Sequence, residues 1–547
     1  MQGLMMDYPL SVQHIFTRAT RLFPHKEIVT KTADGLHRYT YREFGERTAR
    51  LASTLRSLGI QPGDRVGTFG WNTYRHMELY FAVPCMGAVL HTLNIRLFTD
   101  QLEFVVNDAE DKIIVVDADL LPLLEKLAGR MPTVRAFIVM GKPAEPSRLT
   151  PAYDYEALLA SSPAHYEWPR LDENDAAAMC YTSGTTGNPK GVVYSHRSTF
   201  LHSFGACLAD SLGVCERDTV MPVVPMFHAN AWGLIYAGAM AGANMVLPGK
   251  FMTPASLVDL IVGERVTVPA GVPSIWIGLL SHLEQLRREG QAPDFSFVRC
   301  TPCGGSAIPP ALMRGLDSFG MTMLHAWGMT ETSPLASVAK VNSAVATLTP
   351  DEQFAMRCKQ GQVVPGVEVR VLDLATNQEV PWDGKGVGEI QVRGPWIAAA
   401  YYHTRDTGEK FMDGWLRTGD VATIDEYGYM QIVDRTKDLV KSGGEWISSV
   451  ELENVIMAHP KVLEAAVIGA PHPKWQERPV AYVVPKQEFV DQITAEEVLE
   501  YLESRVAKWW LPDEVIFIKE VPKTSVGKFS KRELRDQYAA THTGVMV

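Results

Sequence analysis

Apolar and polar positions along this chain form short strand-like runs that alternate with longer helix-like runs. The run DRVGTFGWN, which starts at Asp64, is followed by HMELYFAVPCMGAVL and later by DKIIVVDADLLPLLEKLAG. Further along, TPASLVDLIVGERVTVPAGVP has the pattern of a helix followed by a strand. This alternation is typical of α/β folds with largely parallel sheets. The polar, proline-containing segment 143–173 is expected to be a surface connection between such elements.

The pattern changes twice towards the C-terminus. Residues 386–433 contain GVGEIQVRG and GWLRTGDVATIDEYGYMQIV, which predict a β-rich region. Residues 451–547 predict a small α+β unit, in which Thr494 and Glu497 have the spacing of a capping box at a helix start. Because 547 residues are too many for one hydrophobic core, we expect at least two domains. The predicted fold is a large N-terminal domain, residues 1–434, of α/β subdomains plus a small β-rich subdomain, followed by a small mobile α+β domain, residues 435–547.

The stretch YTSGTTGNPKG, residues 181–191, has no residues suited to a core, although the apolar lead-in AAAMCY predicts a strand before it. Glycine permits positive φ and close approach, so this loop can turn backbone N–H groups and hydroxyls towards one anion. Lys190 adds a point charge of the kind used on phosphates. A Walker-type loop is excluded, because that motif needs Gly-Lys followed by Ser or Thr, whereas Pro189 precedes Lys190 here and Gly191 follows it.

Composition excludes several classes of function. The net charge of −11 argues against a nucleic-acid partner and against a polybasic membrane anchor. We expect no signal peptide in MQGLMMDYPLSVQH, and no integral membrane segment, because no apolar stretch reaches the ~18 residues that a span needs. Of the seven cysteines only Cys300 and Cys303 have CxxC spacing, so we expect all seven to be reduced, in a cytoplasmic protein.

Two segments carry residues suited to a nucleotide. In FVRCTPCGGSAIP, Gly304 and Gly305 follow a strand-like run and would let a flat ligand lie against the backbone, although a plain turn has the same pattern. In HAWGMTETS, Trp327 offers a flat face for a purine and Thr330 can donate a hydrogen bond to a phosphate. Glu331 in the same motif is a hard oxygen ligand that suits Mg²⁺.

Four further motifs complete the set of candidates. Asp420, in TGD, can accept hydrogen bonds from both hydroxyls of a ribose. The segment PVVPMFHANAWG contains His228 and Trp232, which either line a pocket or fill a core. The segment DRTKDLVKSGGEWISSVELE separates two differently patterned regions and marks a domain boundary. Lys528 lies in the basic loop PKTSVGKFSKREL, where an ordinary surface lysine is the alternative interpretation.

These motifs resemble those of the adenylate-forming superfamily, which includes acyl-CoA synthetases, peptide-synthetase adenylation domains and luciferases. The resemblance covers nearly the whole chain and implies an enzyme that activates a carboxylate with ATP, although the family usually has tyrosine at the position of Trp327. The ATP-binding residues that it implies are Thr182, Ser183, Gly184, Thr185, Thr186, Gly187, Lys190, Gly305, His325, Ala326, Trp327, Thr330, Glu331, Asp420, Arg435, Lys437, Lys441 and Lys528. The implied residues around the acyl substrate are His228, Trp232 and Gly304. Trp446, a large apolar residue in the hinge loop, is a further candidate that either closes the acyl entrance or packs between the domains.

The resemblance further implies two half-reactions. A carboxylate first attacks the α-phosphate of ATP, with Mg²⁺ on Thr182 and Glu331, and with Lys528 reaching the carboxylate and the α-phosphate; these three residues are the implied catalytic set. The small domain would then rotate about Lys437, the implied hinge, so that the thiol of CoA can reach the adenylate. SGGEWIS would lie on the face that rotation brings in.

The acid is the least determined part of this interpretation. The strings VVPMFHANAW, HAWGMTETSP, KSGGEWISSVELE and HPKWQERP most resemble bacterial medium- and long-chain fatty acyl-CoA synthetases, so the expected partners are a fatty acid, ATP and CoA, and a homodimer is one assembly that the resemblance allows. A ligase for a shorter acid, such as a methylthio-alkanoate, stays open, because such enzymes share these strings. From other classes, a luciferase-like oxygenase and a phosphate-binding regulatory protein remain, although the latter would be expected to lack Glu331 or Lys528. The chain ends at Val547 without a carrier domain, which favours free CoA as the thiol.

Overall fold

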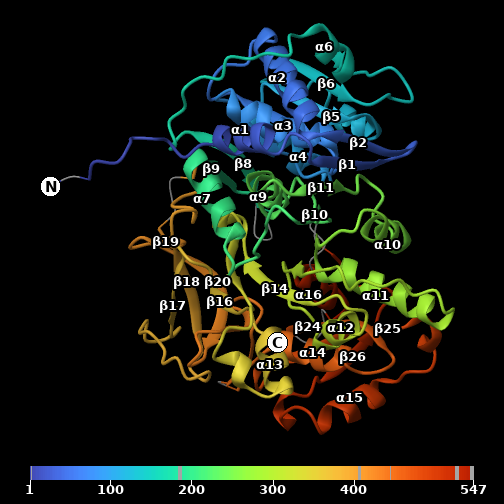
Figure 1. Cartoon of the computed structure of the whole chain (residues 1–547). Helices are drawn as coiled ribbons and strands as arrows, with labels where there is room; N and C mark the ends of the chain where they lie inside the picture. The colour runs from blue at the N-terminus through green and yellow to red at the C-terminus, as the bar shows by residue number, and fades with distance from the viewer. Residues whose placement is uncertain (2, 183–187, 405–407, 444, 524–528, 543–547) are drawn as a thin grey trace.

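Figure 1 gives the arrangement of the chain in a computed structural model, which describes residues 1, 3–182, 188–404, 408–443, 445–523 and 529–542. The blue and green N-terminal elements fill the upper part of the view, the orange β-rich strands lie at lower left, and the red C-terminal elements lie at lower right. The chain is thus a mixed α/β structure with a large N-terminal domain and a small C-terminal one, as the sequence pattern predicted.

The first large sheet has seven strands in the order β7-β6-β5-β3-β4-β8-β9, and all neighbours are parallel except β8 and β9. Its strands are β3 (Arg65–Phe69), β4 (Val89–Thr92), β5 (Ile113–Asp117), β6 (Ala136–Met140), β7 (Ala152–Asp154), β8 (Ala176–Tyr181) and β9 (Gly191–Ser195). The helices between them are α3 (Tyr74–Cys85), α4 (Thr99–Asp108), α5 (Leu121–Leu124) and α6 (Tyr155–Ser161). The loop after β8 therefore leaves the sheet at the end of a buried strand.

The second large sheet has the order β12-β10-β11-β1-β2 and is parallel except at β1 and β2. Its strands are β1 (Glu27–Thr32), β2 (Gly35–Thr40), β10 (Thr219–Pro222), β11 (Asn244–Leu247) and β12 (Val268–Ala270). The surrounding helices are α1 (Val12–Leu22), α2 (Tyr41–Ser57), α7 (His196–Cys207), α8 (Ala229–Trp232), α9 (Leu234–Ala241), α10 (Pro254–Gly263) and α11 (Pro273–Arg288). One hydrophobic core runs through both sheets and their helices.

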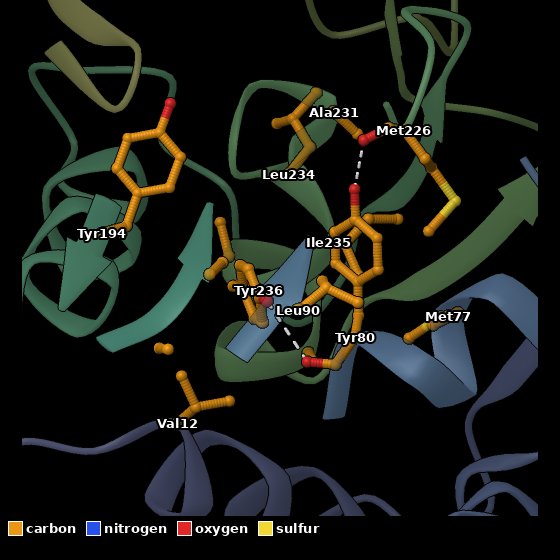
Figure 2. Close-up of a cluster of buried hydrophobic side chains, with 14 of the residues drawn as sticks. Val12, Met77, Tyr80, Leu90, Tyr194, Met226, Ala231, Leu234, Ile235 and Tyr236 are labelled. Atoms are coloured by element: carbon orange, nitrogen blue, oxygen red, sulfur yellow. Dashed lines mark hydrogen bonds between the residues drawn. The ribbon is translucent and has the colours of Figure 1, made fainter. Parts of the chain in front are cut away.

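Buried tyrosines in that core anchor the segment that leads to His228. Figure 2 shows Tyr80 and Tyr236 among aliphatic side chains, with the Tyr80 hydroxyl donating to the carbonyl oxygen of Met226. The Tyr236 hydroxyl donates to the carbonyl oxygen of Tyr80 at 3.2 Å. Since a buried hydroxyl without a partner is costly, the Tyr80 bond fixes the backbone at Met226, just before the turn at His228.

The remaining N-terminal elements form two smaller sheets. The four-stranded sheet consists of β13 (Thr301–Cys303), β14 (Met323–Gly328), β15 (Leu335–Val338) and β16 (Gln362–Val363), with helices α12 (Pro310–Asp317) and α13 (Pro350–Cys358). The five-stranded antiparallel sheet of the predicted β-rich region consists of β17 (Glu368–Leu372), β18 (Gly388–Arg393), β19 (Phe411–Met412), β20 (Trp415–Ile424) and β21 (Met430–Arg435).

The C-terminal part has a sheet and two hydrophobic clusters of its own. Its elements are β22 (Val440–Ser442), β23 (Glu445–Ile447), α14 (Ser449–Met457), β24 (Val462–His472), β25 (Gln476–Pro485), α15 (Ala495–Glu503), β26 (Glu514–Phe517) and α16 (Lys531–Thr541). Strand β21 belongs to the preceding sheet and β22 to this one, so the chain passes between the two sheets in residues 436–439. The short 3₁₀ helices of the whole chain are η1 (Ala118–Leu120), η2 (Glu125–Leu127), η3 (Thr330–Thr332), η4 (Val345–Thr347), η5 (Gln487–Phe489) and η6 (Lys508–Trp510).

Two local predictions need correction. Segment 143–173 is more than a surface connection, because it contains β7 and α6, and α6 buries Tyr155 and Leu159, one helical turn apart. The predicted capping box at α15 is only half formed: Thr494 accepts a hydrogen bond from the Glu497 N–H, but the Glu497 carboxylate pairs with Lys461 Nζ at 2.9 Å. In both places the local structure depends on contacts with distant residues, which a local sequence pattern does not reveal.

All seven cysteines are free thiols. In the described part of the chain, no helix combines the length and the apolar character that crossing a membrane requires.

Candidate active site

A cavity of about 630 Å³ lies where the large sheets, the β-rich region and the C-terminal helices meet. Of the residues singled out from the sequence, it is lined by Thr182, Lys190, His228, Trp232, Gly304, Gly305, His325, Ala326, Trp327, Thr330, Glu331, Asp420, Arg435 and Lys437. Ser183, Gly184, Thr185, Thr186, Gly187 and Lys528 lie outside the described residues. Candidates separated by more than 200 positions in the sequence thus face one space.

The two ends of the loop that follows β8 are held together at the cavity. The Thr182 N–H donates to the Lys190 carbonyl oxygen at 2.9 Å, and the Lys190 N–H donates to the Thr182 hydroxyl oxygen at 3.1 Å. The Lys190 ammonium lies 4.9 Å from the centre of the Tyr401 ring, within cation–π range. Thr182 and Lys190 therefore both line the cavity, at the two ends of the loop.

A flat surface for a base is formed by the glycine pair and by β14. A Cβ added to Gly304 would meet the Ala326 carbonyl oxygen at 2.3 Å, and Gly305 has φ +87°, so neither position accepts a larger side chain without strain. Trp327 is buried in the wall of the same cavity. The nearby His325 imidazole is fully enclosed, and burial lowers its pKa to about 4, so it is neutral at physiological pH.

The carboxylate of Asp420 sits at the centre of a small polar network. It accepts a hydrogen bond from Trp327 Nε1 at 2.9 Å and forms an ion pair with Arg435 Nε at 3.0 Å. Tyrosine, the usual residue at position 327 in the family that the motifs resemble, has no ring N–H that could make the first of these bonds. Tryptophan at this position therefore links the aromatic ring by a hydrogen bond to Asp420, the candidate ribose-binding carboxylate.

Glu331 is held in place from one side. Its Oε1 accepts a hydrogen bond of 2.5 Å from the Tyr401 hydroxyl, and among the described residues no donor reaches its other oxygen. No group of three or more His, Cys, Asp or Glu side chains in the described part of the chain is arranged to hold a metal ion. A single carboxylate with one free oxygen fits Mg²⁺, which commonly uses one or two carboxylates together with phosphate oxygens and water. Thr182 and Glu331 are the side chains that would hold it here.

The apolar end of the cavity is shaped by a left-handed turn. Residues Ala229 to Trp232 have φ between 41° and 57°, and Gly233 has φ 71°. Left-handed backbone costs roughly 1–2 kcal/mol per non-glycine residue, so this turn needs support. The side chain of Asn230 supplies it, because its Oδ1 accepts from Cys180 Sγ at 3.1 Å. The turn lies between His228 and Gly233 and carries Trp232 into the cavity wall.

Two predicted site residues are not in this cavity. Lys441 and Trp446 face each other across the β22–β23 hairpin, with the Lys441 ammonium 5.3 Å from the Trp446 ring centre, and neither lines the cavity. Trp446 is 41% exposed. In this orientation the C-terminal domain instead turns α14 and the start of α16 towards the cavity, through Glu453, Asn454 and Lys531 among others. The assignment of Lys441 and Trp446 to the ligand site therefore stays a prediction.

Several lining residues carried no recognisable sequence signal. Tyr401, Lys410 and Gln360 lie outside any motif pattern. Tyr401 and Lys410 reach the cavity from the β-rich region between β18 and β20, whereas Gln360 comes from the segment between α13 and β16 of the four-stranded sheet. Tyr401 follows a run of alanines and could have been read as core. Its bond to Glu331 and its ring beside the Lys190 ammonium show its place in the site.

Comparison with known proteins agrees with this geometry. The family model described as AMP-binding enzyme matches residues 16–402, and the model described as AMP-binding enzyme C-terminal domain matches residues 451–528. A solved structure of an anthranilate CoA ligase in complex with anthranoyl-AMP has a TM-score of 0.86 at 25% identity, covering 98% of this chain and 99% of that one.

Three curated relatives match along almost their full length. The long-chain-fatty-acid–CoA ligase of Thermus thermophilus is 47% identical, covering 99% of this chain and 98% of the relative. The 3-methylmercaptopropionyl-CoA ligase of Ruegeria lacuscaerulensis is 44% identical over 100% of both chains. The medium-chain-fatty-acid–CoA ligase of Ectopseudomonas oleovorans is 42% identical over 98% of both.

Proposed function

This chain belongs to the AMP-binding enzyme family, and from that premise we propose that it activates a medium- to long-chain fatty acid to its CoA thioester with ATP. The reaction proceeds through an acyl-adenylate and releases AMP and pyrophosphate. The observation that carries the proposal is that one cavity joins the polar wall of Trp327, Glu331 and Asp420 to the wall formed by His228 and Trp232. A nucleotide and an acyl chain would meet between these walls.

In the first half-reaction, an oxygen of the fatty-acid carboxylate bonds to the α-phosphorus and the bond to pyrophosphate breaks. Trp327 would cover the adenine, and Asp420 would accept hydrogen bonds from the ribose hydroxyls with Arg435 beside it. Lys190 and the loop that it closes would face the phosphates. Mg²⁺ held by Thr182 and Glu331 would neutralise phosphate charge as the two anions approach. Lys528, from the C-terminal loop, would also neutralise phosphate charge.

In the second half-reaction, the thiol of CoA attacks the acyl carbon and AMP leaves. We propose that the domain boundary lies between residues 434 and 435 and that the small domain rotates about Lys437. Lys437 lines the cavity and lies in the short passage between the sheets of β21 and β22, which supports this assignment. Rotation would bring the β22–β23 hairpin, with Lys441 and Trp446, to the place that α14 occupies.

The test is a series of initial rates with saturated acids of increasing length, ATP and CoA, with AMP and thioester measured together. We expect the specificity constant to rise into the medium- to long-chain range. A maximum for 3-(methylthio)propionate would instead favour the shorter-acid alternative, which the relative from Ruegeria supports. Light emission with oxygen and without a need for CoA would favour a luciferase-like oxygenase.

We also propose a cytoplasmic location and a homodimer. The seven free thiols fit a reducing compartment. Leu4, Met5 and Met6 are more than 85% exposed, and an interface between two copies would bury this apolar surface. Light scattering coupled to size-exclusion chromatography distinguishes one copy from two, and deletion of residues 2–8 should weaken the dimer.

A further inference from the structure

Lys410 is a partly buried cation in the wall of the cavity that no sequence motif pointed to. Its ammonium donates one hydrogen bond, of 2.9 Å, to the carbonyl oxygen of Thr418. Within the described residues, no other acceptor and no carboxylate lies in hydrogen-bond or ion-pair range of it. An ammonium has three N–H donors, so two remain for a ligand.

The surroundings of Lys410 indicate what this ligand is. Glu331 and Asp420 are the two carboxylates whose charges raise the pKa of Lys410 most, and both line the same cavity. Glu389 acts in the same direction but more weakly and does not line the cavity, whereas Arg435, which does, lowers the pKa. In the proposed function, Asp420 holds the ribose and Glu331 holds Mg²⁺ on the phosphates. The group that lies covalently between a ribose and the metal-bound phosphates of ATP is the α-phosphoryl group.

The lysine is also desolvated without being neutralised. Burial lowers the pKa of Lys410, and the charges of Glu331 and Asp420 act in the opposite direction from beyond contact distance. A buried cation without a contacting anion is costly unless a ligand supplies one. An anionic ligand in this part of the cavity would therefore gain more from Lys410 than from a solvated surface lysine.

We propose that Lys410 binds an oxygen of the α-phosphoryl group, both in ATP and in the acyl-adenylate. This role rests on the proposed function. Lys410 transfers no proton, because it acts as a charged hydrogen-bond donor while the carboxylate bonds to the phosphorus and pyrophosphate leaves with the bonding electrons. It lies on the β-rich sheet, immediately before β19, and so on the large domain. Its contact would persist when the small domain rotates, whereas that of Lys528 would be withdrawn.

The first experiment compares the affinities of the protein for AMP and for adenosine by titration calorimetry. Lys410→Gln removes the charge but keeps a donor for the Thr418 carbonyl oxygen, Lys410→Arg keeps the charge, and Lys385→Gln is the control at an exposed lysine of the same sheet region. A charge-assisted hydrogen bond predicts roughly tenfold or greater loss of AMP affinity in Lys410→Gln. Adenosine affinity should stay unchanged, and Lys410→Arg should recover part of the loss.

Two outcomes would overturn the assignment of Lys410, and two others bear on the proposed function. Equal losses of affinity for AMP and for adenosine would mean that Lys410 only supports the Thr418 turn. Unchanged affinity for both would mean that Lys410 does not contact the ligand. If the parent protein bound neither AMP nor adenosine, the proposed function itself would fall. If the parent bound both but activated no fatty acid, only the substrate assignment would fall.

The second experiment separates the half-reactions. Lys410→Gln should slow adenylate formation and also slow thioester formation from supplied acyl-adenylate, each by roughly tenfold, because the contact is present in both. Lys528→Ala should slow the first alone. A Lys410→Gln variant that slows only adenylate formation would contradict a contact that persists through the domain rotation.

Discussion

The backbone N–H of Ser449 donates a hydrogen bond of 2.7 Å to Oδ2 of Asp434, which joins the first turn of α14 to the end of β21. The Ser449 hydroxyl bonds to the same oxygen and accepts in turn from Lys531 Nζ at 2.6 Å. Lys531 also pairs with Glu453 at 2.7 Å. These contacts connect the β-rich sheet to the C-terminal domain in the orientation in which α14 and α16 line the cavity.

Loss of the Asp434 carboxylate should therefore change the rates of the two half-reactions differently. Asp434→Ala should slow adenylate formation several-fold, because the observed orientation loses its junction contact. Thioester formation from supplied acyl-adenylate should be unchanged or faster. Rapid-quench measurement of both steps gives the result. Asp434→Asn is the matched control, because its side-chain oxygen can still accept from Ser449, and it should lie close to the parent. Equal slowing of both steps by the alanine variant would mean that Asp434 supports the fold or the ligand and not the orientation.

The hydrogen bond from Tyr401 to Glu331 makes a prediction about magnesium. Tyr401→Phe removes the donor but keeps the ring beside Lys190, so it should raise the Mg²⁺ concentration needed for half-maximal rate by several-fold. Glu331→Gln should have a larger effect, because a neutral amide lacks the charge that a hard cation needs. Mg²⁺ titrations of the rate at saturating ATP measure both. If Tyr401→Phe lowers the maximal rate without moving the Mg²⁺ dependence, the tyrosine does not act through the metal ligand.

The sequence predicted those parts of the site that lie in contiguous motifs. Trp327, Thr330 and Glu331 come from one short segment, and the glycine pair and the TGD turn also converge on the cavity. Local residue types carry this information, because a glycine or a lone carboxylate in a loop has a restricted set of uses. The α/β class could be predicted from strand–helix alternation, because that alternation is also a local pattern in the sequence.

What the sequence did not predict depends on packing between distant segments. Lys410 and Tyr401 lie outside any recognisable motif, and the pairing of β18, β19 and β20 brings these two residues to Glu331 and Asp420. The position of Trp446 relative to the cavity could not be predicted for another reason. If the small domain rotates as proposed, its hairpin has two environments, and residue types do not show which of them a given orientation presents.

Trp232 should set the length of the acyl chain that the cavity accepts. Trp232→Ala opens volume at the apolar end, and each further methylene buried there stabilises the complex by about 0.8 kcal/mol, or roughly fourfold in kcat/KM. The optimum should move to longer acids. A chain-length profile of kcat/KM for the variant, the parent and a Trp382→Ala control, whose indole is 49% exposed, tests this. An unshifted optimum in a folded variant would place Trp232 in the core and not in the acyl site.

Two buried histidines predict a loss of stability in acid. His202 Nε2 accepts a hydrogen bond from the Leu335 N–H at 3.1 Å, and His196 Nδ1 accepts one from the Val12 N–H at 3.3 Å, so protonation would remove both bonds. Burial lowers the pKa of each from 6.5 to about 4. Between pH 4 and pH 6.5 the unfolded chain therefore binds more protons than the folded chain does. The free energy of unfolding should fall as the pH falls from 6.5 towards 4. Each histidine contributes up to roughly 3 kcal/mol to that fall.

Denaturant unfolding at pH 7 and pH 5 measures this effect. His202→Gln keeps an acceptor for the Leu335 N–H but does not titrate, so its stability should fall less between the two pH values than that of the parent. His25→Gln, at an exposed histidine, is the control and should follow the parent. A His202→Gln variant with the pH dependence of the parent would rule out His202 as a source of the acid sensitivity.

Trp446 should matter for the thiol step and not for the acid. Its side chain lies on the β22–β23 hairpin against Lys441, outside the cavity, in the orientation that presents α14 and α16 to the ligand. Trp446→Ala should therefore leave both the rate of adenylate formation and the KM for the fatty acid close to those of the parent. Thioester formation should slow, because rotation of the small domain would bring this hairpin to the adenylate, and Trp446→Phe should restore much of the rate by keeping an aromatic face. Pyrophosphate release in a single turnover without CoA isolates the first step, and transfer from supplied acyl-adenylate isolates the second. A raised KM for the acid in the first step would instead put Trp446 at the acyl entrance before any rotation, and the orientation with the hairpin outside the cavity would then not be the one that forms the adenylate.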